Sequence, residues 1–327
     1  MNKIKDKKVL ITGGLGMIGS TMAEKLVGFG TDVTIVDSLI KPYGGNFFNI
    51  ENIKNKINVN VSDIRDKESL KILVKDVDII FNLAGQVSHN DSIENPTLDA
   101  DINYIGHLNV LEAVRNYNPK AKILYSGSRL QFGKIIKNPV NEDHPLHPLT
   151  PYALNKTAAE NLYLYYQRVY NIPVVIFRIA NPYGTRCQMQ HSKYAIINWF
   201  IRNAMENKEI LIFGDGSQMR DYIFVEDLAD AFIKASIQDN TSGEVFNIGS
   251  GTGTKFKDMV ETIVETVGKG KIKNVPWPSN YLNVETGGYI TDITKIKKYI
   301  RWRPKFSLKE GVKQTVDYYK KFKENYW

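Results

Sequence analysis

The stretch that decides the fold lies near the start of the chain and reads Val9-Leu-Ile-Thr-Gly13-Gly14-Leu15-Gly16-Met17-Ile18-Gly19-Ser20. A short apolar run leads into glycines spaced three apart, and a helical pattern follows them. Gly13 allows a tight turn, Gly16 lets the backbone approach a pyrophosphate, and Gly19 lets the helix pack closely on the strand. Ordinary strand-to-helix turns also use glycine, so the surroundings must decide whether this is a dinucleotide site. Its candidate cofactor-binding residues are Gly13, Gly16, Met17, Ile18 and Gly19.

Strand and helix patterns alternate on both sides of this turn through the first 180 residues. Strands are expected at 8–12, 32–37, 57–61, 77–84, 122–126 and 174–179, and helices at 17–29, 67–75, 96–117 and 151–170. This alternation predicts an α/β fold with a doubly wound parallel Rossmann sheet that has helices on both faces.

After about residue 180 the alternation loosens. Helices are expected at 195–206, 225–235, 256–267 and 307–325, strands at 209–213 and 244–248, and a loop at 277–282. We therefore expect residues 1–180 to form a dinucleotide-binding domain. Residues 181–327 should form a smaller C-terminal α/β substrate-binding domain, some of whose elements return to the main sheet.

The composition is typical of a folded domain and excludes a disordered, collagen-like or disulfide-stapled chain. The 327 residues are 43% hydrophobic and include a single cysteine, Cys187, which cannot form an internal disulfide. Such cysteine usage indicates a reducing compartment. No apolar run approaches the roughly 20 residues that cross a bilayer, so we expect a cytoplasmic protein without membrane contact.

The net charge of +8 comes from 43 Lys and Arg against 35 Asp and Glu, and the lysines are spread along the chain. A solvated lysine-rich surface explains this surplus better than nucleic-acid binding, and an anionic small ligand comes second. Two prolines interrupt the pair His144 and His147, one between them and one directly after, and no carboxylate partner is evident. We expect no metal site.

Polar and small residues at the ends of later strands extend the cofactor prediction. Asp37 ends the second strand eighteen residues after Gly19. A carboxylate there would bind ribose hydroxyls and repel a 2′-phosphate, which favours NAD over NADP. The alternative is that Asp37 only caps the next turn. Asp63 and Ile64 are placed to meet the adenine, and the segment where the cofactor would cross the sheet is Leu83, Ala84 and Gly85.

A phenol and an ammonium group lie four residues apart in Tyr152-Ala-Leu-Asn-Lys156, on one face of an expected helix. Free tyrosine has a pKa of about 10, so a tyrosine base working near neutrality needs a cation to stabilise its phenolate. The alternative is a solvent-facing pair of no function. Ser128 argues against it, because it follows the fifth strand at the sheet edge where such folds bind ligands.

Together these motifs resemble a known family, the extended short-chain dehydrogenase/reductases, in their NAD-dependent nucleotide-sugar epimerase/dehydratase branch. The resemblance covers nearly the whole chain, including the segments 12–19, 82–85 and 126–133. It implies catalytic roles for Ser128, Tyr152 and Lys156, with the last two also contacting NAD.

The same resemblance implies further site residues. Asn103 matches a structural asparagine beside the cofactor, and Asn181 and Arg220 match residues that bind the diphosphate of a nucleotide-sugar substrate. Gln86, in the loop after the fourth strand, joins Ser128 as a candidate for substrate contact. Family members commonly form homodimers through the helices that match 96–117 and 151–170, so a homodimer is expected.

Two departures from the family pattern bear on the reaction. In the 4,6-dehydratases the residue matching Ser128 is followed by Asp-Glu, whereas here it is followed by Arg129-Leu130. Without an acid and a base at these positions, epimerisation or simple oxidoreduction is favoured over elimination of water. Many relatives also place an arginine before the closing aspartate, but the segment 283–289 contains none. Either Lys193 or another cation replaces it, or the leaving nucleotide is held differently.

We therefore expect an NAD-dependent nucleotide-sugar epimerase that acts through a 4-keto intermediate. The alternatives within the enzyme class are a sugar C4 dehydrogenase or reductase and a 4,6-dehydratase. The alternative from another class is a non-catalytic NAD-binding sensor, which would not need Ser128, Tyr152 and Lys156.

Overall fold

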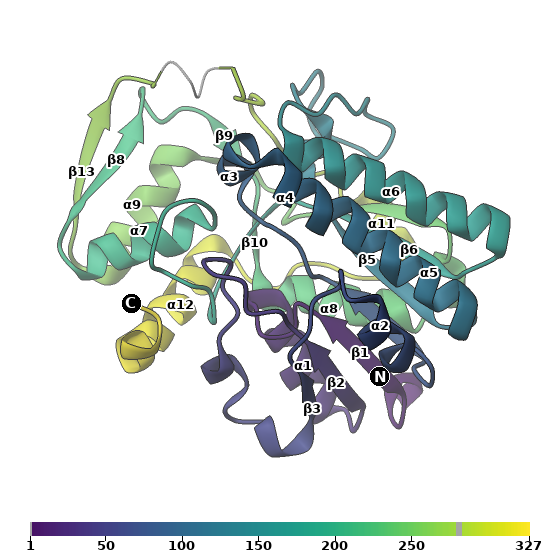
Figure 1. Cartoon of the computed structure of the whole chain (residues 1–327). Coiled ribbons are helices and arrows are strands. Elements are labelled where there is room, and N and C mark those ends of the chain that lie inside the picture. Colours follow the sequence, from purple (N-terminus) through teal and green to yellow (C-terminus); the bar gives the residue numbers. More distant parts are fainter. Residues whose placement is uncertain (1, 279–282) are drawn as a thin grey trace.

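The computed structural model of the chain describes residues 2–278 and 283–327, so most of the loop expected at 277–282 lies outside the described residues. Its centre is a seven-stranded sheet (Figure 1). The strands, all parallel, run in the order β11-β6-β5-β4-β1-β2-β3. Their bounds are β1 Lys8–Thr12, β2 Asp32–Val36, β3 Asn58–Asn60, β4 Ile79–Asn82, β5 Lys122–Ser128, β6 Val174–Ile179 and β11 Glu244–Ile248. The Rossmann prediction is confirmed.

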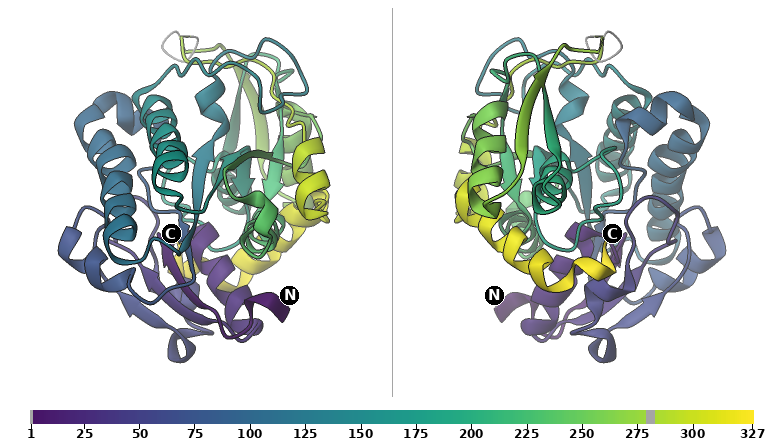
Figure 2. Two further views of the ribbon diagram at one scale, coloured as in Figure 1. Left: turned by 90° about the vertical axis from the view of Figure 1, so that its right-hand side faces the viewer. Right: turned by 90° about the vertical axis from the view of Figure 1, so that its left-hand side faces the viewer.

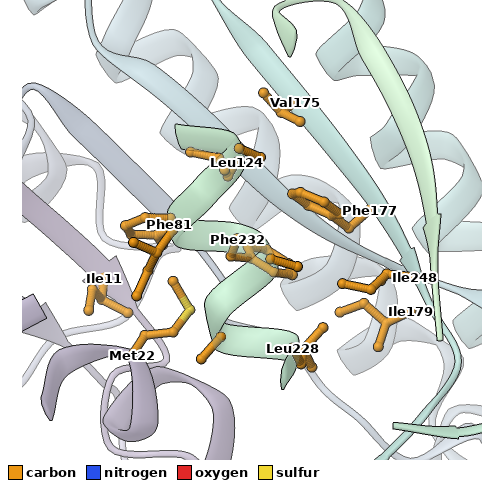
Figure 3. Packing of buried hydrophobic residues seen from close by; sticks show 14 of the residues in the cluster. Ile11, Met22, Phe81, Leu124, Val175, Phe177, Ile179, Leu228, Phe232 and Ile248 are labelled. Carbon is orange, nitrogen blue, oxygen red and sulfur yellow. The ribbon is translucent and has the colours of Figure 1, made fainter. Parts of the chain in front are cut away.

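Helices cover both faces of the sheet because successive strand side chains point to opposite faces. On one face α1 (Met17–Gly28) and α8 (Val225–Ser236) pack on residues such as Ile11, Phe81 and Phe177 (Figure 3). On the other face α2 (Lys67–Leu73), α5 (His107–Tyr117) and α6 (Pro151–Tyr170) pack on Leu10 and Ile80. The strands are thus apolar on both sides, which explains why their sequences read as continuous hydrophobic runs.

The sheet has a topological switch point between β1 and β4. From β1 the chain builds outward through β2 and β3, and it then returns to build β4, β5 and β6 on the other side. The loops leaving β1 and β4 therefore diverge, and a crevice opens beyond the carboxyl ends of these strands.

A third apolar core lies in what we call the C-terminal lobe, formed by α7 (Ile196–Met205), α9 (Phe256–Val267), α12 (Leu308–Phe322) and β8 (Glu209–Phe213). β13 (Lys271–Val275) pairs with β8 in parallel, and two further two-stranded pairs join β7 (Asn181–Tyr183) to β10 (Tyr222–Phe224) and β9 (Met219–Arg220) to β12 (Thr254–Lys255). The last residues then pack against the first half of the chain, where the Tyr326 hydroxyl donates to Asn49 Oδ1 at 2.5 Å (Figure 2).

Several elements differ from the sequence prediction. The helix expected at 96–117 is divided into α4 (Pro96–Ala100), a π-helical segment Asp101–Gly106, and α5. The helices α3 (His89–Glu94) and α11 (Thr294–Ile300) were not expected, nor was β13. β13 has four exposed residues out of five, so no buried face marks it in the sequence. No helix in the described ranges is long and apolar enough to cross a membrane.

Candidate active site

A cavity of about 830 Å³ opens beyond the carboxyl ends of the sheet strands and extends to the C-terminal lobe. The loops that follow β1 and β4 line it together with the ends of β5 and β6, and residues from α7 and β8 also line it. Candidate residues that are far apart in the sequence meet here, at the switch point where open α/β sheets bind ligands.

The glycine turn forms one end of the cavity. Gly13 has φ +67°, a left-handed conformation that glycine adopts without strain. A Cβ on Gly19 would lie 2.3 Å from the Gly13 carbonyl oxygen, so only glycine lets α1 sit this close to the turn. α1 begins after Gly16, and no side chain of the described chain caps its first N–H groups. These donors lie at the cavity. Its lining at this end includes Gly13, Gly16, Met17, Ile18 and Gly19.

Asp37 lies at the rim of the same end and lines the cavity. Its carboxylate accepts hydrogen bonds from the backbone N–H groups of Leu15 (3.0 Å) and Leu39 (2.9 Å). Burial raises the pKa of Asp37, and the two backbone donors oppose that effect. Asp37 therefore caps the next turn and also lines the cavity, so the ribose-binding interpretation and the turn-capping interpretation do not exclude each other.

Asp63, Ile64, Leu83, Ala84 and Gly85 line the adjoining wall. Arg65 holds the Asp63 carboxylate in a two-pronged pair with Nε–Oδ1 at 3.0 Å and Nη2–Oδ2 at 2.8 Å. Burial alone would raise the pKa of Asp63, but the bonds from Arg65 bring it below the usual value. Asp63 is thus an ionised acceptor in a fixed orientation.

Ser128, Tyr152 and Lys156 also line this cavity. Tyr152 and Lys156 are almost fully buried, with 9% and 3% of their surfaces exposed. This excludes the alternative that the two form a solvent-facing pair of no function. Burial raises the pKa of Tyr152 to about 12, Ser128 opposes this by hydrogen bonding to the phenol, and Asp99 adds to it. Burial lowers the pKa of Lys156 to about 8, and Asp99 opposes that effect. Lys156 Nζ donates to the Ser126 carbonyl oxygen at 3.1 Å.

Two buried residues that the sequence analysis missed support this group. Asp99, on α4, accepts hydrogen bonds from Asn155 (2.7 Å) and Asn103 (3.0 Å) and acts electrostatically on Lys156 and Tyr152. Asn103 is only four residues away in sequence, but Asn155 is 56 residues away, so the role of Asp99 beside the catalytic group appears only in the folded chain.

The second missed residue is Gln131, which connects the serine loop to the buried core. Its Oε1 accepts the Ser128 N–H at 2.7 Å, and its Nε2 donates to Glu160 at 2.7 Å. Glu160 in turn pairs with Arg178, with Nη2–Oε1 at 2.6 Å and both side chains buried. This chain of contacts fixes the backbone at Ser128 and gives a physical reason for a glutamine at position 131.

Two sequence candidates lie behind the cavity wall instead of in it. Gln86 is buried and donates to the Ser88 carbonyl at 2.8 Å, and Asn103 is buried and donates to the Gln86 carbonyl at 2.9 Å. Neither lines the cavity. Their hydrogen bonds fix the loop behind Gly85. The space there is tight, since a Cβ on Gly85 would lie 2.8 Å from Asn103 Oδ1.

Asn181 and Arg220 lie at the opposite end of the cavity from the glycine turn. Arg220 Nη2 contacts both carboxylate oxygens of Glu285, at 2.7 and 2.8 Å. Asn181 Oδ1 accepts from Arg129 Nε at 3.0 Å, and its amide donates to the Asp221 carbonyl at 2.7 Å. Arg129 therefore contacts Asn181 directly, and the charges of Arg220 and Glu285 both act on Arg129.

Comparison with known proteins agrees with this geometry. The sequence model of the family described as GDP-mannose 4,6 dehydratase matches residues 10–315. The chain belongs to the extended short-chain dehydrogenase/reductases. Within this family it is 36% identical over 315 residues to a putative UDP-glucose 4-epimerase of Methanocaldococcus jannaschii, a match that covers 95% of this chain and 98% of the relative.

Solved structures of the family superimpose over almost the entire chain. A UDP-glucose 4-epimerase from Thermotoga maritima, solved with UDP-glucose, is 31% identical with a TM-score of 0.86, and the match covers 96% of this chain and 99% of that one. A Thermus thermophilus UDP-glucose 4-epimerase, solved with NAD, is 27% identical with a TM-score of 0.84, and the match covers 96% and 99% of the two chains. The fold of this chain thus resembles that of both epimerases.

Proposed function

We propose that the chain is an NAD-dependent nucleotide-sugar epimerase that transiently oxidises the sugar at C4. The observation that supports this most is the meeting of Ser128, Tyr152 and Lys156 in one cavity with the glycine turn and Asp37. The residues after Ser128 are Arg129 and Leu130, so this loop brings neither of the carboxylates that elimination of water would use.

The residues at the glycine end fit a dinucleotide. The uncapped N-terminus of α1 and the space kept by Gly16 suit a pyrophosphate, Asp37 suits ribose hydroxyls, and Asp63 with Ile64 suits an adenine. NAD bound there supplies the hydride acceptor and donor for the sugar carbon. Asp37 would repel the 2′-phosphate of NADP.

Tyr152 is the proposed base that removes the proton of the sugar hydroxyl, and Ser128 is the group that hydrogen-bonds the same oxygen. Both line the cavity with little exposure and are hydrogen-bonded to each other, so one substrate oxygen can contact both hydroxyls. In this structure Lys156 is not among the groups that shift the Tyr152 pKa, since its ammonium faces Ser126 and Asp99. We propose that Lys156 assists by contacting the cofactor and by the positive charge it adds to the site. General base action of this kind typically contributes about 10² to 10⁴ in rate.

Asn181 and Arg220 are the proposed contacts of the substrate diphosphate. They lie at the end of the cavity that leads to the C-terminal lobe, whose aromatic residues Phe256 and Trp277 suit a nucleotide base. We accordingly assign residues 1–180 to cofactor binding and 181–327 mainly to substrate binding.

We further propose a homodimer formed through α5 and α6. Leu154, Tyr165 and Val169 lie on one face of α6 and are 58%, 42% and 52% exposed. These spacings of eleven and four residues keep the three side chains on one stripe of the helix. An apolar stripe on the surface is typical of an interface.

The test is incubation of the purified protein with UDP-, GDP-, CDP- and dTDP-sugars. We expect a C4 epimer without net NADH, and we expect Tyr152→Phe, which keeps the aromatic ring, to abolish turnover while retaining NAD. Net NADH would instead indicate a dehydrogenase, a 4-keto-6-deoxy product a dehydratase, and binding of NAD without any conversion a sensor.

A further inference from the structure

Arg129 is a partly buried cation whose hydrogen-bond partners are neutral. Its Nε donates to Asn181 Oδ1 at 3.0 Å, its Nη1 donates to Thr286 Oγ1 at 3.1 Å, and its guanidinium lies 5.4 Å from the centre of the Tyr289 ring. No ion pair to it is present among the described residues. A charge that is shielded from water and has no direct counter-charge is costly, and it is usually kept where a ligand supplies the opposite charge.

The neighbouring cations differ from Arg129, because each has a carboxylate partner. Arg220 is paired with both oxygens of Glu285, and Lys193 is paired with Asp91 at 2.6 Å. Burial, with a smaller repulsion from Arg220, lowers the pKa of Arg129 to about 10, which leaves it charged at neutral pH. Among the described residues at this end of the cavity, Arg129 is thus the cation without a direct carboxylate partner, and Glu285 acts on it only at longer range.

The position of Arg129 shows which part of a ligand it can reach. It directly follows Ser128, lines the cavity, and extends from the catalytic loop to Asn181 and to the segment around Thr286. That segment is the one in which the sequence lacks an arginine. The guanidinium therefore lies between the sugar-oxidising group and Arg220.

The charge balance of this end indicates what kind of ligand fits. Arg129 and Arg220 together with Glu285 give a net charge of +1, and the diphosphate of a nucleotide sugar carries about two negative charges. The diphosphate alone already exceeds the available positive charge. A carboxylate on the sugar would add a third negative charge, and in the described chain the further cations that line the cavity are Lys193, which is paired with Asp91, and Lys156, which lies in the catalytic group.

We propose that Arg129 binds the sugar-linked phosphate of the substrate in place of the missing arginine, and that the site selects nucleotide sugars whose sugar is uncharged. This inference rests on the proposed function. It also assigns a role to Glu285, which competes with the diphosphate for Arg220 and so weakens substrate binding.

The experiment is calorimetric titration of the full-length protein with UDP, or with whichever nucleoside diphosphate the unmodified protein binds. Arg129→Gln should weaken binding about ten- to a hundredfold, because a charge-assisted hydrogen bond is lost. Glu285→Gln should strengthen binding. Lys193→Gln, which removes the rival cation, should change the dissociation constant less than Arg129→Gln does. Unchanged NAD binding shows that each variant is folded.

The outcomes separate this inference from the proposed function. If the unmodified protein binds no nucleoside diphosphate, both fail. If it binds and converts a nucleotide sugar but Arg129→Gln binds the diphosphate equally well, only the inference fails. A kcat/KM for UDP-glucose at least tenfold above that for UDP-glucuronate is expected. The reverse preference, lost in Arg129→Gln, would reassign Arg129 to a sugar carboxylate and overturn the proposal.

Discussion

At the scale of single residues, Gln131 determines how firmly the serine loop is fixed. It joins the Ser128 N–H to Glu160 and thus to Arg178 through hydrogen bonds of 2.7 Å on each side. Gln131→Leu has a similar volume but would leave the Ser128 N–H unpaired and would remove one of the two hydrogen bonds to Glu160 Oε2, the other coming from Arg178 Nε. We expect a loss of about 1–3 kcal/mol in the free energy of unfolding. We also expect a lower kcat with little change in KM, measured by urea denaturation and steady-state kinetics. An unchanged kcat would show that the loop is held by other contacts.

Asp99 is the residue that we expect to set the pH dependence of the reaction. Its negative charge raises the pKa of Tyr152 and opposes the lowering of the Lys156 pKa. In Asp99→Asn the charge is removed, so the pKa values of both groups should fall. Because the base works when Tyr152 is deprotonated, the acid limb of the kcat/KM profile should move to lower pH. An acid limb that moves to higher pH, in a protein with unchanged NAD binding, would contradict this assignment.

The residues that could not be predicted share a physical feature. Glycines, β-branched strands and the Tyr152–Lys156 spacing leave local patterns in the sequence, and these predicted the turn and the catalytic group. Gln131 and Glu160 are 29 residues apart, and Arg220 and Glu285 are 65 apart. Pairs that meet only through the tertiary fold leave no periodicity, so the partners of Gln131 and Arg220, Glu160 and Glu285, emerged only from the structure.

At the scale of elements, the first turn of α1 is tightly constrained by its packing on the glycine turn. A Cβ on Gly19 would lie 2.3 Å from the Gly13 carbonyl oxygen and 2.8 Å from Gly14 Cα, and both are backbone atoms that cannot move aside. We expect Gly19→Ala to displace α1 and to weaken NAD binding about tenfold or more. Fluorescence titration with NADH and a thermal melt would measure both effects.

Gly28 is a matched control at the other end of α1. No heavy atom lies within 4 Å of a Cβ built there. Gly28→Ala should therefore leave NAD binding unchanged. It should also stabilise the protein by about 0.4–1 kcal/mol, because alanine restricts the unfolded chain more than glycine does. If Gly19→Ala and Gly28→Ala changed NAD binding equally, crowding at the turn would not be the reason for a glycine at position 19.

At the scale of the whole molecule, the exposed stripe on α6 predicts the assembly state. Tyr165→Asp together with Val169→Asp puts two charges into the proposed interface and should convert the dimer to a monomer in analytical ultracentrifugation. Both side chains are exposed in the single chain, so its folding should change little. A wild-type protein that sediments as a monomer would contradict the proposal.

The late position of β11 in the sequence also has a consequence for the synthesis of this protein and for the design of chimaeras. The strand beside β6 comes from residues 244–248, long after the other six strands of the sheet have been synthesised. During translation the edge of β6, apolar on both faces, has no neighbour until this segment emerges, which is the situation in which unpaired strands associate with other chains. Chimaeras that exchange the two halves near residue 180 would take the outer strand of the sheet from a foreign sequence. A grafted substrate specificity should therefore keep β11 with the parent that supplies β6.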